Sequence, residues 1–381
     1  MAVELDRGAM LAHRLAVQGL HGDLPVDELD VLTVGLQDTP AGSAALGLRQ
    51  RGVDGGLARP ELVLALTLRG SPHVHRRVDL PLLRAALWPH DNDALRAYLG
   101  GYGDELIASG ADGPALLETV VAELRAAFPG ETATKGELSA AVGPRLPKVA
   151  RPWCAGCGTD HVADGLFRLA TLYAGVEVEP HDGRRLRFRM APSAEVADDD
   201  GASVELLRQY LRLAGPATLG DLTVWLDTRS VTTPPDVLKQ SFDALRDELE
   251  QVYVEGVQAP LWAHAEAVAA LAGAPGPPLA LMLPPRDAYV LGSRAFLVPD
   301  RAAAKAVWRS VGSPGVLVLA GEVAGVWRAR QSGRTLRLTV TAHRTLTKKE
   351  RAAVERQGDV VAAARGHEGR TEVVWDEWSG R

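Results

Sequence analysis

The spacing of apolar residues along this chain predicts short elements in an order that repeats. Residues 62–69 carry leucine at every second position, which predicts a strand, and the Gly-Ser-Pro sequence that follows predicts a turn into a return strand over 73–78. Partial apolar stripes predict a helix and its exit in 8–30 and a helix of small residues over 40–51. Two helices followed by a hairpin is the element order of a winged helix-turn-helix unit.

The same order of helices followed by a small hairpin recurs twice further along the chain. The predicted elements are helices over 114–128, 134–142 and 166–174 with a hairpin over 176–188, then helices over 204–213, 219–226 and 235–249 with a hairpin over 252–261. Thr134 and Glu137 have the spacing of a capping box at the start of one of these helices. A small, acidic segment at 194–202 is the predicted linker between the two groups.

The C-terminal third has a different pattern. An Ala-, Gly- and Pro-rich segment at 270–285 interrupts the repeat, and short strands are expected at 289–291, 295–298, 315–319, 322–327 and 335–341, with helices over 301–310 and 348–364. We therefore expect an α+β chain of tandem winged helix-turn-helix units followed by a small C-terminal β-barrel-like domain. The expected boundaries are 1–110, 111–194 and 203–262 for the three units and 280–370 for the β domain with its C-terminal helix.

Composition narrows the class of protein. A chain of 381 residues is expected to form two to four domains, and 46% hydrophobic with 24% charged residues is ordinary for a soluble globular protein. No apolar run reaches membrane-spanning length, the N-terminus lacks a signal-peptide pattern, and two cysteines argue against a disulfide scaffold. We expect a cytoplasmic protein.

The charge is unevenly distributed. A net charge of −6 counts against nonspecific coating of nucleic acid, but residues 301–358 hold twelve Lys and Arg against three Glu. A basic region on an acidic protein is typical of local phosphate contact. The alternative is that these residues form a solvent-exposed strand surface that is rich in arginine and contacts no phosphate.

The stretch with the most chemistry is Leu36-Gln37-Asp38-Thr39-Pro40. An apolar run ends there with one amide and one carboxylate, two groups that can hold and activate a water molecule without a metal or a cysteine nucleophile. The alternative is structural: Asp38 or Thr39 caps the next helix, with Pro40 at its first position.

This stretch resembles the Leu-Gln-x-Gln/Asp motif of the winged-helix DNA glycosylases, the AlkZ/YcaQ-like family. Thr39 stands where the family has its second Gln or Asp, and this chain has its acid one position earlier, at Asp38. Further segments that resemble the family are Ser43-Ala44 with Leu46 to Arg49 or Arg51, Arg69 to His73, Ala86 to Pro89, Gly215 to Leu222, Asp287 to Gly292 and Gly325 to Arg328. The resemblance extends over about residues 8–365.

The resemblance implies a monofunctional DNA glycosylase that hydrolyses the N-glycosidic bond of N7- or N3-alkylated purines, bulky or crosslinked ones included, in DNA repair or self-resistance. It implies Asp38 as general base, Gln37 as the group that holds the water, and Thr39 as a second hydrogen-bonding group. The implied partner is double-stranded DNA carrying alkylated bases, which implies a nucleoid-associated protein in the cytoplasm. The resemblance implies no cofactor, no membrane and no obligate protein partner. The alternative is a non-catalytic winged-helix DNA-binding protein or regulator, since winged-helix units bind DNA in both classes of protein.

Basic residues near these segments are the candidate DNA contacts. They are Arg49 and Arg51 after the motif, Arg69, His73, His75, Arg76 and Arg77 on the predicted hairpin, and Arg328 and Arg330 on a C-terminal strand. For the first two, a favourable interaction of a helix C-terminus with positive charge is the alternative. For the residues of the hairpin, the alternative to DNA contact is that they form the polar, solvent-exposed tip of the hairpin.

Cys154, Cys157 and His161 form a further group with three interpretations. They are a loop with both thiols reduced, part of a zinc site whose fourth ligand is Asp160, His181 or a water, or a redox pair. The family resemblance requires no metal, so the prediction for this chain is none, with these three residues as the weak candidate.

Overall fold

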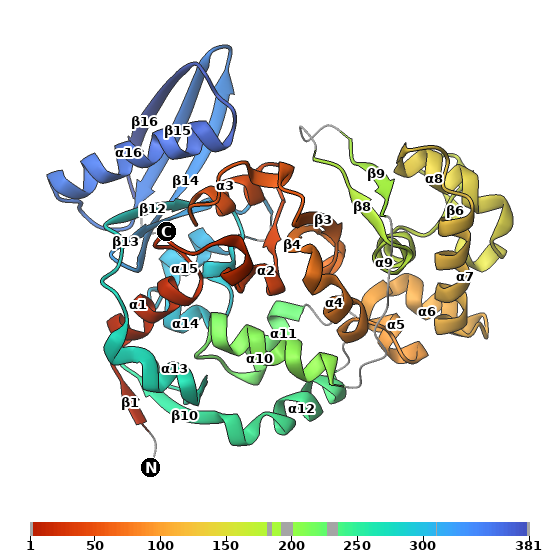
Figure 1. Cartoon of the computed structure of the whole chain (residues 1–381), viewed down its shortest axis with the longest axis horizontal. Helices are drawn as coiled ribbons and strands as arrows, with labels where there is room; N and C mark the ends of the chain where they lie inside the picture. The colour runs from red at the N-terminus through yellow and green to blue at the C-terminus, as the bar shows by residue number, and fades with distance from the viewer. Residues whose placement is uncertain (1–2, 181–184, 192–200, 227–234, 310, 379–381) are drawn as a thin grey trace. The chain divides into compact units, whose positions relative to one another are not determined.

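The computed structural model describes residues 3–180, 185–191, 201–226, 235–309 and 311–378. Its contacts group the chain into two compact units. The first unit comprises Met1–Gly56, Arg208–Asp221 and Arg246–Arg381, and the second comprises Leu57–Leu207 and Leu222–Leu245. The first unit thus joins both ends of the chain, the red and the blue segments of Figure 1. The predicted linker lies almost entirely outside the described residues, as does His181.

The N-terminal strand of the first unit joins a sheet formed much later in the sequence. β1 (Val3–Leu5) pairs in parallel with β10 (Leu249–Val254), which pairs antiparallel with β11 (Leu261–His264). The β10–β11 hairpin confirms the prediction over 252–261. The sequence did not predict the third strand, because a three-residue strand has no periodicity to detect.

Short helices follow β1 in the first unit. They are α1 (Arg7–Val17), α2 (Val31–Val34) and α3 (Ser43–Arg49), and further along the chain α13 (Ala265–Ala270), α14 (Arg294–Leu297) and α15 (Arg301–Val307). α3 begins three residues after Pro40, because Gly42 has a left-handed φ of 84° that precedes the first helical residue. Residues 289–291 and 295–298, predicted as strands, lie in short helical turns instead. Asp287 and Ser293 accept backbone N–H groups at the start of these turns, from Tyr289 at 2.9 Å and Phe296 at 3.4 Å.

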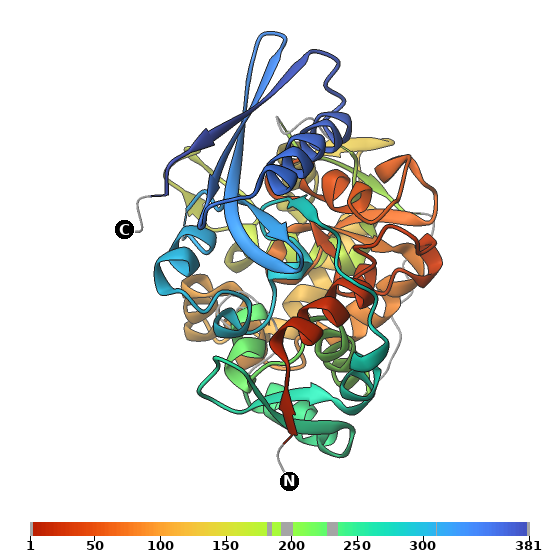
Figure 2. The ribbon, with the colours of Figure 1, turned by 90° about the vertical axis from the view of Figure 1, so that its left-hand side faces the viewer.

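A five-stranded sheet forms the C-terminal part of the first unit. Its strands, in spatial order, are β12 (Ala280–Leu283), β13 (Gly315–Leu319), β14 (Glu322–Ser332), β15 (Thr335–Ala342) and β16 (Arg370–Asp376). Neighbours are antiparallel except β15 and β16, whose parallel pairing follows from the crossover helix α16 (Lys348–Ala364) between them. Figure 2 shows these long strands with α16 beside them.

The expected barrel-like closure is wrong. β12 and β16 are the two ends of the strand order and do not pair, so the sheet is open. The physical reason is that α16 covers one face of the sheet: Val354 and Val361 of the helix share a buried apolar cluster with Leu336, Leu338 and Val340 of β15.

Gly315 is required where β13 approaches β14. The Trp327 indole donates to the carbonyl of Leu283 at 2.9 Å, and a Cβ on Gly315 would lie 2.3 Å from the Trp327 ring. A side chain there would displace the ring from the core. The sheet therefore depends on this glycine for its packing.

The second unit is mostly helical. Its helices are α4 (Leu80–Ala86), α5 (Asn92–Leu99), α6 (Gly101–Ala108), α7 (Gly113–Ala126), α8 (Lys135–Val142), α9 (Asp164–Ala174) and α12 (Pro235–Ala244). Thr134 and Glu137 form the predicted capping box at α8. Helices α10 (Ala202–Ala214) and α11 (Leu219–Leu226) belong partly to each unit. Among the described residues, no helix has the length and hydropathy needed to cross a membrane.

Small strands complete the second unit. They are β3 (Leu62–Leu66), β4 (Pro72–Arg76), β5 (Thr132–Thr134), β6 (Trp153–Cys154), β7 (Thr159–Asp160), β8 (Val176–Val178) and β9 (Arg187–Met190). The β3–β4 hairpin confirms the prediction, and β9 lies between β5 and β8 in a three-stranded sheet. The predicted division into four segments differs from the two units, since 1–110 contributes to both of them.

Candidate active site

Gln37 and Asp38 lie at the end of a short buried strand of the first unit. Gly35, with a φ of 83°, ends α2 and redirects the chain into β2 (Leu36–Gln37). The side chains that follow are inside the protein: Gln37 is 5% exposed and Asp38 is 3% exposed. An amide and a carboxylate are therefore held next to each other on a rigid segment, as the sequence predicted.

Asp38 is anchored to the helix that follows. Its Oδ1 accepts a hydrogen bond from the backbone N–H of Ala44 at 2.9 Å, in the first turn of α3. The predicted capping role is thus present, but Asp38 acts from outside the helix, whose N-cap residue is Gly42. Ser43 adds a second local restraint, since its hydroxyl donates to the carbonyl of Pro40 at 2.6 Å. The cap fixes the orientation of the carboxylate, so capping and catalysis are compatible roles for Asp38.

Thr39 has a different environment. It is exposed, whereas the two residues before it are buried. The position at which the related motif has its second Gln or Asp is therefore an accessible hydroxyl in this chain.

Helix α3 is clamped to the C-terminal sheet and its helix. The Gln50 amide donates to the carbonyl of Met282 on β12 at 3.0 Å and to Oε1 of Gln357 on α16 at 2.8 Å. The same Oε1 accepts from the backbone N–H of Met282 at 3.3 Å. The helix that anchors Asp38 thus has a fixed position within the first unit.

A buried ion pair lies at the end of α3. Arg51 and Asp287 are both 0% exposed in their side chains, and Arg51 donates to both carboxylate oxygens, at 2.9 and 3.0 Å. Its other bonds go to the carbonyls of Gln18 and Gly47, both at 2.9 Å, and to Oε1 of Gln18 at 3.3 Å. All five guanidinium N–H donors have an acceptor, which is the condition for burying an arginine.

This position corrects one predicted DNA contact. Arg51 is enclosed in the core and engaged in five hydrogen bonds, so it cannot reach a phosphate. Arg49, two residues earlier, is exposed and pairs with Asp54 at 2.9 Å. Asp287 was part of a segment that resembled the family, but the sequence did not reveal its partner, 236 residues away.

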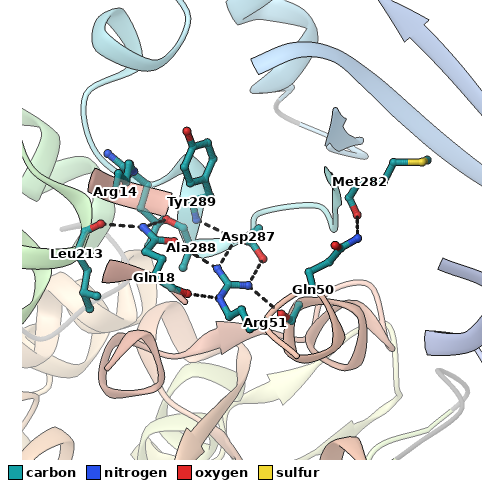
Figure 3. Close-up of polar contacts among 11 residues, drawn as sticks. Arg14, Gln18, Gln50, Arg51, Leu213, Met282, Asp287, Ala288 and Tyr289 are labelled. Carbon is teal, nitrogen blue, oxygen red and sulfur yellow. Dashed lines mark hydrogen bonds and ion pairs between the residues drawn. The ribbon is translucent and has the colours of Figure 1, made fainter. Parts of the chain in front are cut away.

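The ion pair is part of a larger polar layer, shown in Figure 3. Arg14 on α1 donates to the carbonyls of Ala214, at 2.8 Å, and Leu291. The Gln18 amide donates to the carbonyls of Leu213 at 2.8 Å and Ala288 at 3.3 Å. Burial lowers the pKa of Arg14 below its ordinary value. These bonds join α1, α10 and the segment after β12 into one support behind α3.

The predicted basic hairpin, in the second unit, is largely buried. His73 is 2% exposed and His75 is 0% exposed, which does not fit an accessible wing that enters a DNA groove. His73 Nδ1 donates to the carbonyl of Ser71 at 2.9 Å, and His75 Nε2 lies 2.9 Å from the Thr67 hydroxyl. Burial, with the nearby charge of Arg69, holds the pKa of His73 well below its ordinary value. Both histidines are therefore buried side chains whose hydrogen bonds are made within the second unit.

The arginines of this hairpin have partners within the second unit. Arg69 donates to the carbonyl of Trp225 at 2.8 Å, and Arg76 pairs with Asp79 at 2.8 Å. Arg77 pairs with Glu177, a carboxylate that also bonds Arg189 at 2.9 Å. All three guanidinium groups are thus held by contacts within the second unit, although only Arg76 pairs with a carboxylate that is not shared with a second arginine in these contacts.

The C-terminal sheet carries exposed positive charge. Arg328 and Arg330 lie on either side of the partly buried Ala329 on β14 and are both exposed. Arg330 lies directly opposite Arg337 of β15, an arrangement of like charges that is unfavourable without a neutralising partner. Arg337 shares Glu372 with Arg370, at 3.6 and 3.2 Å. This face can attract an anion.

One group in the described part of the chain has the composition of a metal site. Cys154, Cys157 and His161 each bring one ligand atom within 4.8 Å of the others. A hydrogen bond with His161 lowers the pKa of the Cys154 thiol to about 7. The group lies in the second unit.

This chain, a mixed α+β scaffold with an open sheet, matches a known family. Residues 32–364 match the family model described as DNA glycosylase AlkZ-like. The chain belongs to the AlkZ-like DNA glycosylase family.

Two related proteins come from Streptomyces sahachiroi. An interstrand DNA cross-link repair glycosylase is 34% identical to this chain over 200 residues, which are 49% of this chain and 51% of that protein, so the match spans about half of its length. The solved structure of the DNA glycosylase AlkZ has a TM-score of 0.73 and 21% identity, and the match covers 98% of this chain and 100% of that one. The similarity to the solved structure shows that the two chains share a fold.

Proposed function

We propose that this chain is a monofunctional DNA glycosylase that hydrolyses the N-glycosidic bond of N7- or N3-alkylated purines, including bulky and crosslinked adducts. The observation that carries the proposal is the buried Gln37–Asp38 pair, oriented by the first turn of α3, in a chain of the AlkZ-like family. The cross-link repair glycosylase of Streptomyces sahachiroi supports the substrate class.

The chemistry needs few groups because alkylation activates the substrate. An N7- or N3-alkylpurine is cationic, so the base departs with the electron pair of the glycosidic bond and becomes neutral. The sugar gains oxocarbenium character, and a water oxygen forms the new bond to C1′ as the water loses a proton. The protein must hold that water, accept the proton and stabilise the positive charge on the sugar.

In the proposed mechanism, the Asp38 carboxylate accepts the proton and faces the developing positive charge. The Ala44 N–H holds the carboxylate in one orientation, so little reorganisation is needed when the water reacts. The Gln37 amide positions the water, and the exposed Thr39 hydroxyl is a further hydrogen-bonding group at the same turn.

The DNA partner is proposed to contact exposed arginines of the first unit. Arg328 and Arg330 on β14 are the strongest candidates, since a phosphate would relieve the repulsion between Arg330 and Arg337. Arg49 is a third, after exchange of its exposed pair with Asp54. We further propose that the helix–hairpin groups act as tandem winged helices on duplex DNA, in the cytoplasm.

The test is release of 7-methylguanine, and of a bulky N7-guanine adduct, from duplex DNA, with strand cleavage by alkali at the abasic product as the readout. The wild-type chain should release the base. Asp38→Asn should lower the single-turnover rate by about 10²–10⁴, the usual contribution of a general base. Gln37→Ala should also lower the rate, and both variants should keep the affinity for duplex DNA.

Asp23→Asn is the matched control, because Asp23 is an exposed acid of the same unit. Its rate should equal that of the wild type. Tight duplex binding without release of either base would contradict the glycosylase proposal and favour a DNA-binding protein or regulator. Release that persists in Asp38→Asn would leave the activity standing and overturn the role of Asp38.

A further inference from the structure

Strands β6 and β7 of the second unit form a very small hairpin around the two cysteines. Trp153 pairs with Asp160 and Cys154 with Thr159, so each strand contributes two residues. The turn is tight: the N–H groups of Cys157 and Gly158 both donate to the carbonyl of Cys154, at 3.2 and 2.9 Å. Gly158 has a φ of 64°, which glycine adopts without strain. The turn therefore folds Cys157 back toward Cys154.

His161 follows β7 directly and has a fixed orientation. Its Nδ1 donates to the carbonyl of Val162 at 2.9 Å, which places the proton on Nδ1 and leaves the lone pair on Nε2. Such a bond from the second ring nitrogen to a carbonyl is the usual support of a metal-binding histidine. The N–H of Val162 in turn donates to the Ser139 hydroxyl on α8 at 3.0 Å, so the ligand is tied to a helix.

The three ligand atoms lie within 4.8 Å of one another. With Zn–S and Zn–N distances of about 2.3 and 2.0–2.1 Å, ligands of a tetrahedral site are about 3.3–3.8 Å apart. Two thiolates and one imidazole are ligands that zinc prefers. Small side-chain rotations bring the atoms to these distances, because all three residues are at least partly exposed and not fixed by core packing.

We propose that Cys154, Cys157 and His161 bind one Zn²⁺ ion, with a water molecule as the fourth ligand. Water has access because Cys157 and His161 line a cavity of about 690 Å³ beside α8. The assignment differs from the prediction of no metal, and it does not depend on the glycosylase activity.

The ion would supply the stability that the hairpin lacks. Two-stranded hairpins are marginal in water without a hydrophobic face, and here the Trp153 side chain is 64% exposed. A metal that crosslinks the turn to the residue after β7 contributes folding free energy directly. Its role is therefore structural, in holding residues 153–161 in one conformation.

The experiment uses the full-length chain, stripped of metal with a chelator under reducing conditions. One equivalent of Co²⁺ should give a thiolate-to-cobalt absorption band and the visible bands of tetrahedral cobalt, and Zn²⁺ should abolish both. Removal of zinc should lower the melting temperature, and one equivalent of Zn²⁺ should restore it. Failure of the unmodified protein to give the thiolate band would overturn the proposal, whatever the variants do.

The variants Cys157→Ser and His161→Ala should lower zinc affinity by more than about 100-fold, since outer-shell changes alone cost 10–100-fold. His90→Ala is the control, because His90 is an exposed histidine of the same unit, and it should bind zinc as the wild type does. Equal zinc affinity in all three would contradict the site. Rapid formation of a Cys154–Cys157 disulfide that zinc does not prevent would favour a redox pair instead.

Discussion

The ion pair between Arg51 and Asp287 should be the most sensitive point in the first unit. In Arg51→Met the side chain keeps its approximate length, but five hydrogen bonds are lost and the fully buried Asp287 loses its counter-charge. The carboxylate keeps a bond from the N–H of Tyr289, which cannot replace a guanidinium. Removing one partner of a buried pair costs about 3–5 kcal/mol.

This cost is large compared with the stability of a domain. The first unit has roughly 200 residues, for which each kcal/mol lowers the melting temperature by about 2–4 °C. Arg51→Met should therefore melt about 6–20 °C below the wild type. Differential scanning calorimetry, with urea unfolding followed by circular dichroism, measures the change.

Arg49→Met is the control, because Arg49 is the last residue of α3, two residues before Arg51, and its exposed ion pair contributes about 0–1 kcal/mol. The double variant Arg51→Met/Asp287→Asn removes both charges and should recover part of the loss, with a coupling energy of about 0.5–3 kcal/mol. If Arg51→Met costs no more than Arg49→Met, the pair does not hold α3 in place and the reasoning is refuted.

Three further outcomes are expected. Arg330→Ala should weaken duplex binding and reduce the slope of log affinity against log salt by about 0.9, the value for one phosphate contact, and an unchanged slope would exclude such a contact. His73 is buried with its pKa well below the ordinary 6.5, so the folded chain binds fewer protons than the unfolded chain; stability should be full above about pH 6.5 and fall as the pH decreases below it. Urea midpoints across this range should show a shallower acid-side decline for His73→Asn, and an equal decline would assign it to other groups. Thr347→Ala breaks the capping box with Glu350 at α16 and should cost about 1 kcal/mol in urea unfolding, whereas an unaffected midpoint would mean that packing alone holds this helix.

Local signals in the sequence were sufficient for several elements. The capping box of Thr134 and Glu137 and the alternating leucines of β3 each depend on residues a few positions apart, and both are confirmed. The apolar run that ends in Gln37 and Asp38 indicated a buried element before them, but the burial of the two side chains themselves came from the structure. The family resemblance, rather than spacing, gave these two residues a chemical role.

Features that depend on distant segments could not be predicted from pattern. β16 has no clear alternation of apolar and polar residues, and it becomes a strand through its parallel pairing with β15, from which α16 separates it in the sequence. Arg51 has the sequence context of an exposed helix end, and nothing near it indicates Asp287 as a partner. The barrel expectation was wrong for a related reason: local pattern indicated β13, β14 and β15, but β12 and β16, the two edges of the sheet that decide whether it closes, were not predicted.

The segmental construction of the first unit sets the order in which a ribosome-bound chain can complete it. Arg51 emerges 236 residues before Asp287, which at 5–20 residues per second is a delay of about 12–47 s. β1 likewise cannot pair until β10 has been synthesised. Most of the second unit is made between these two strands as one continuous stretch, Leu57–Leu207. Nascent chains halted before residue 287 should therefore contain α3 without the carboxylate that pairs with Arg51, so the helix that anchors Asp38 is made early and held in place late.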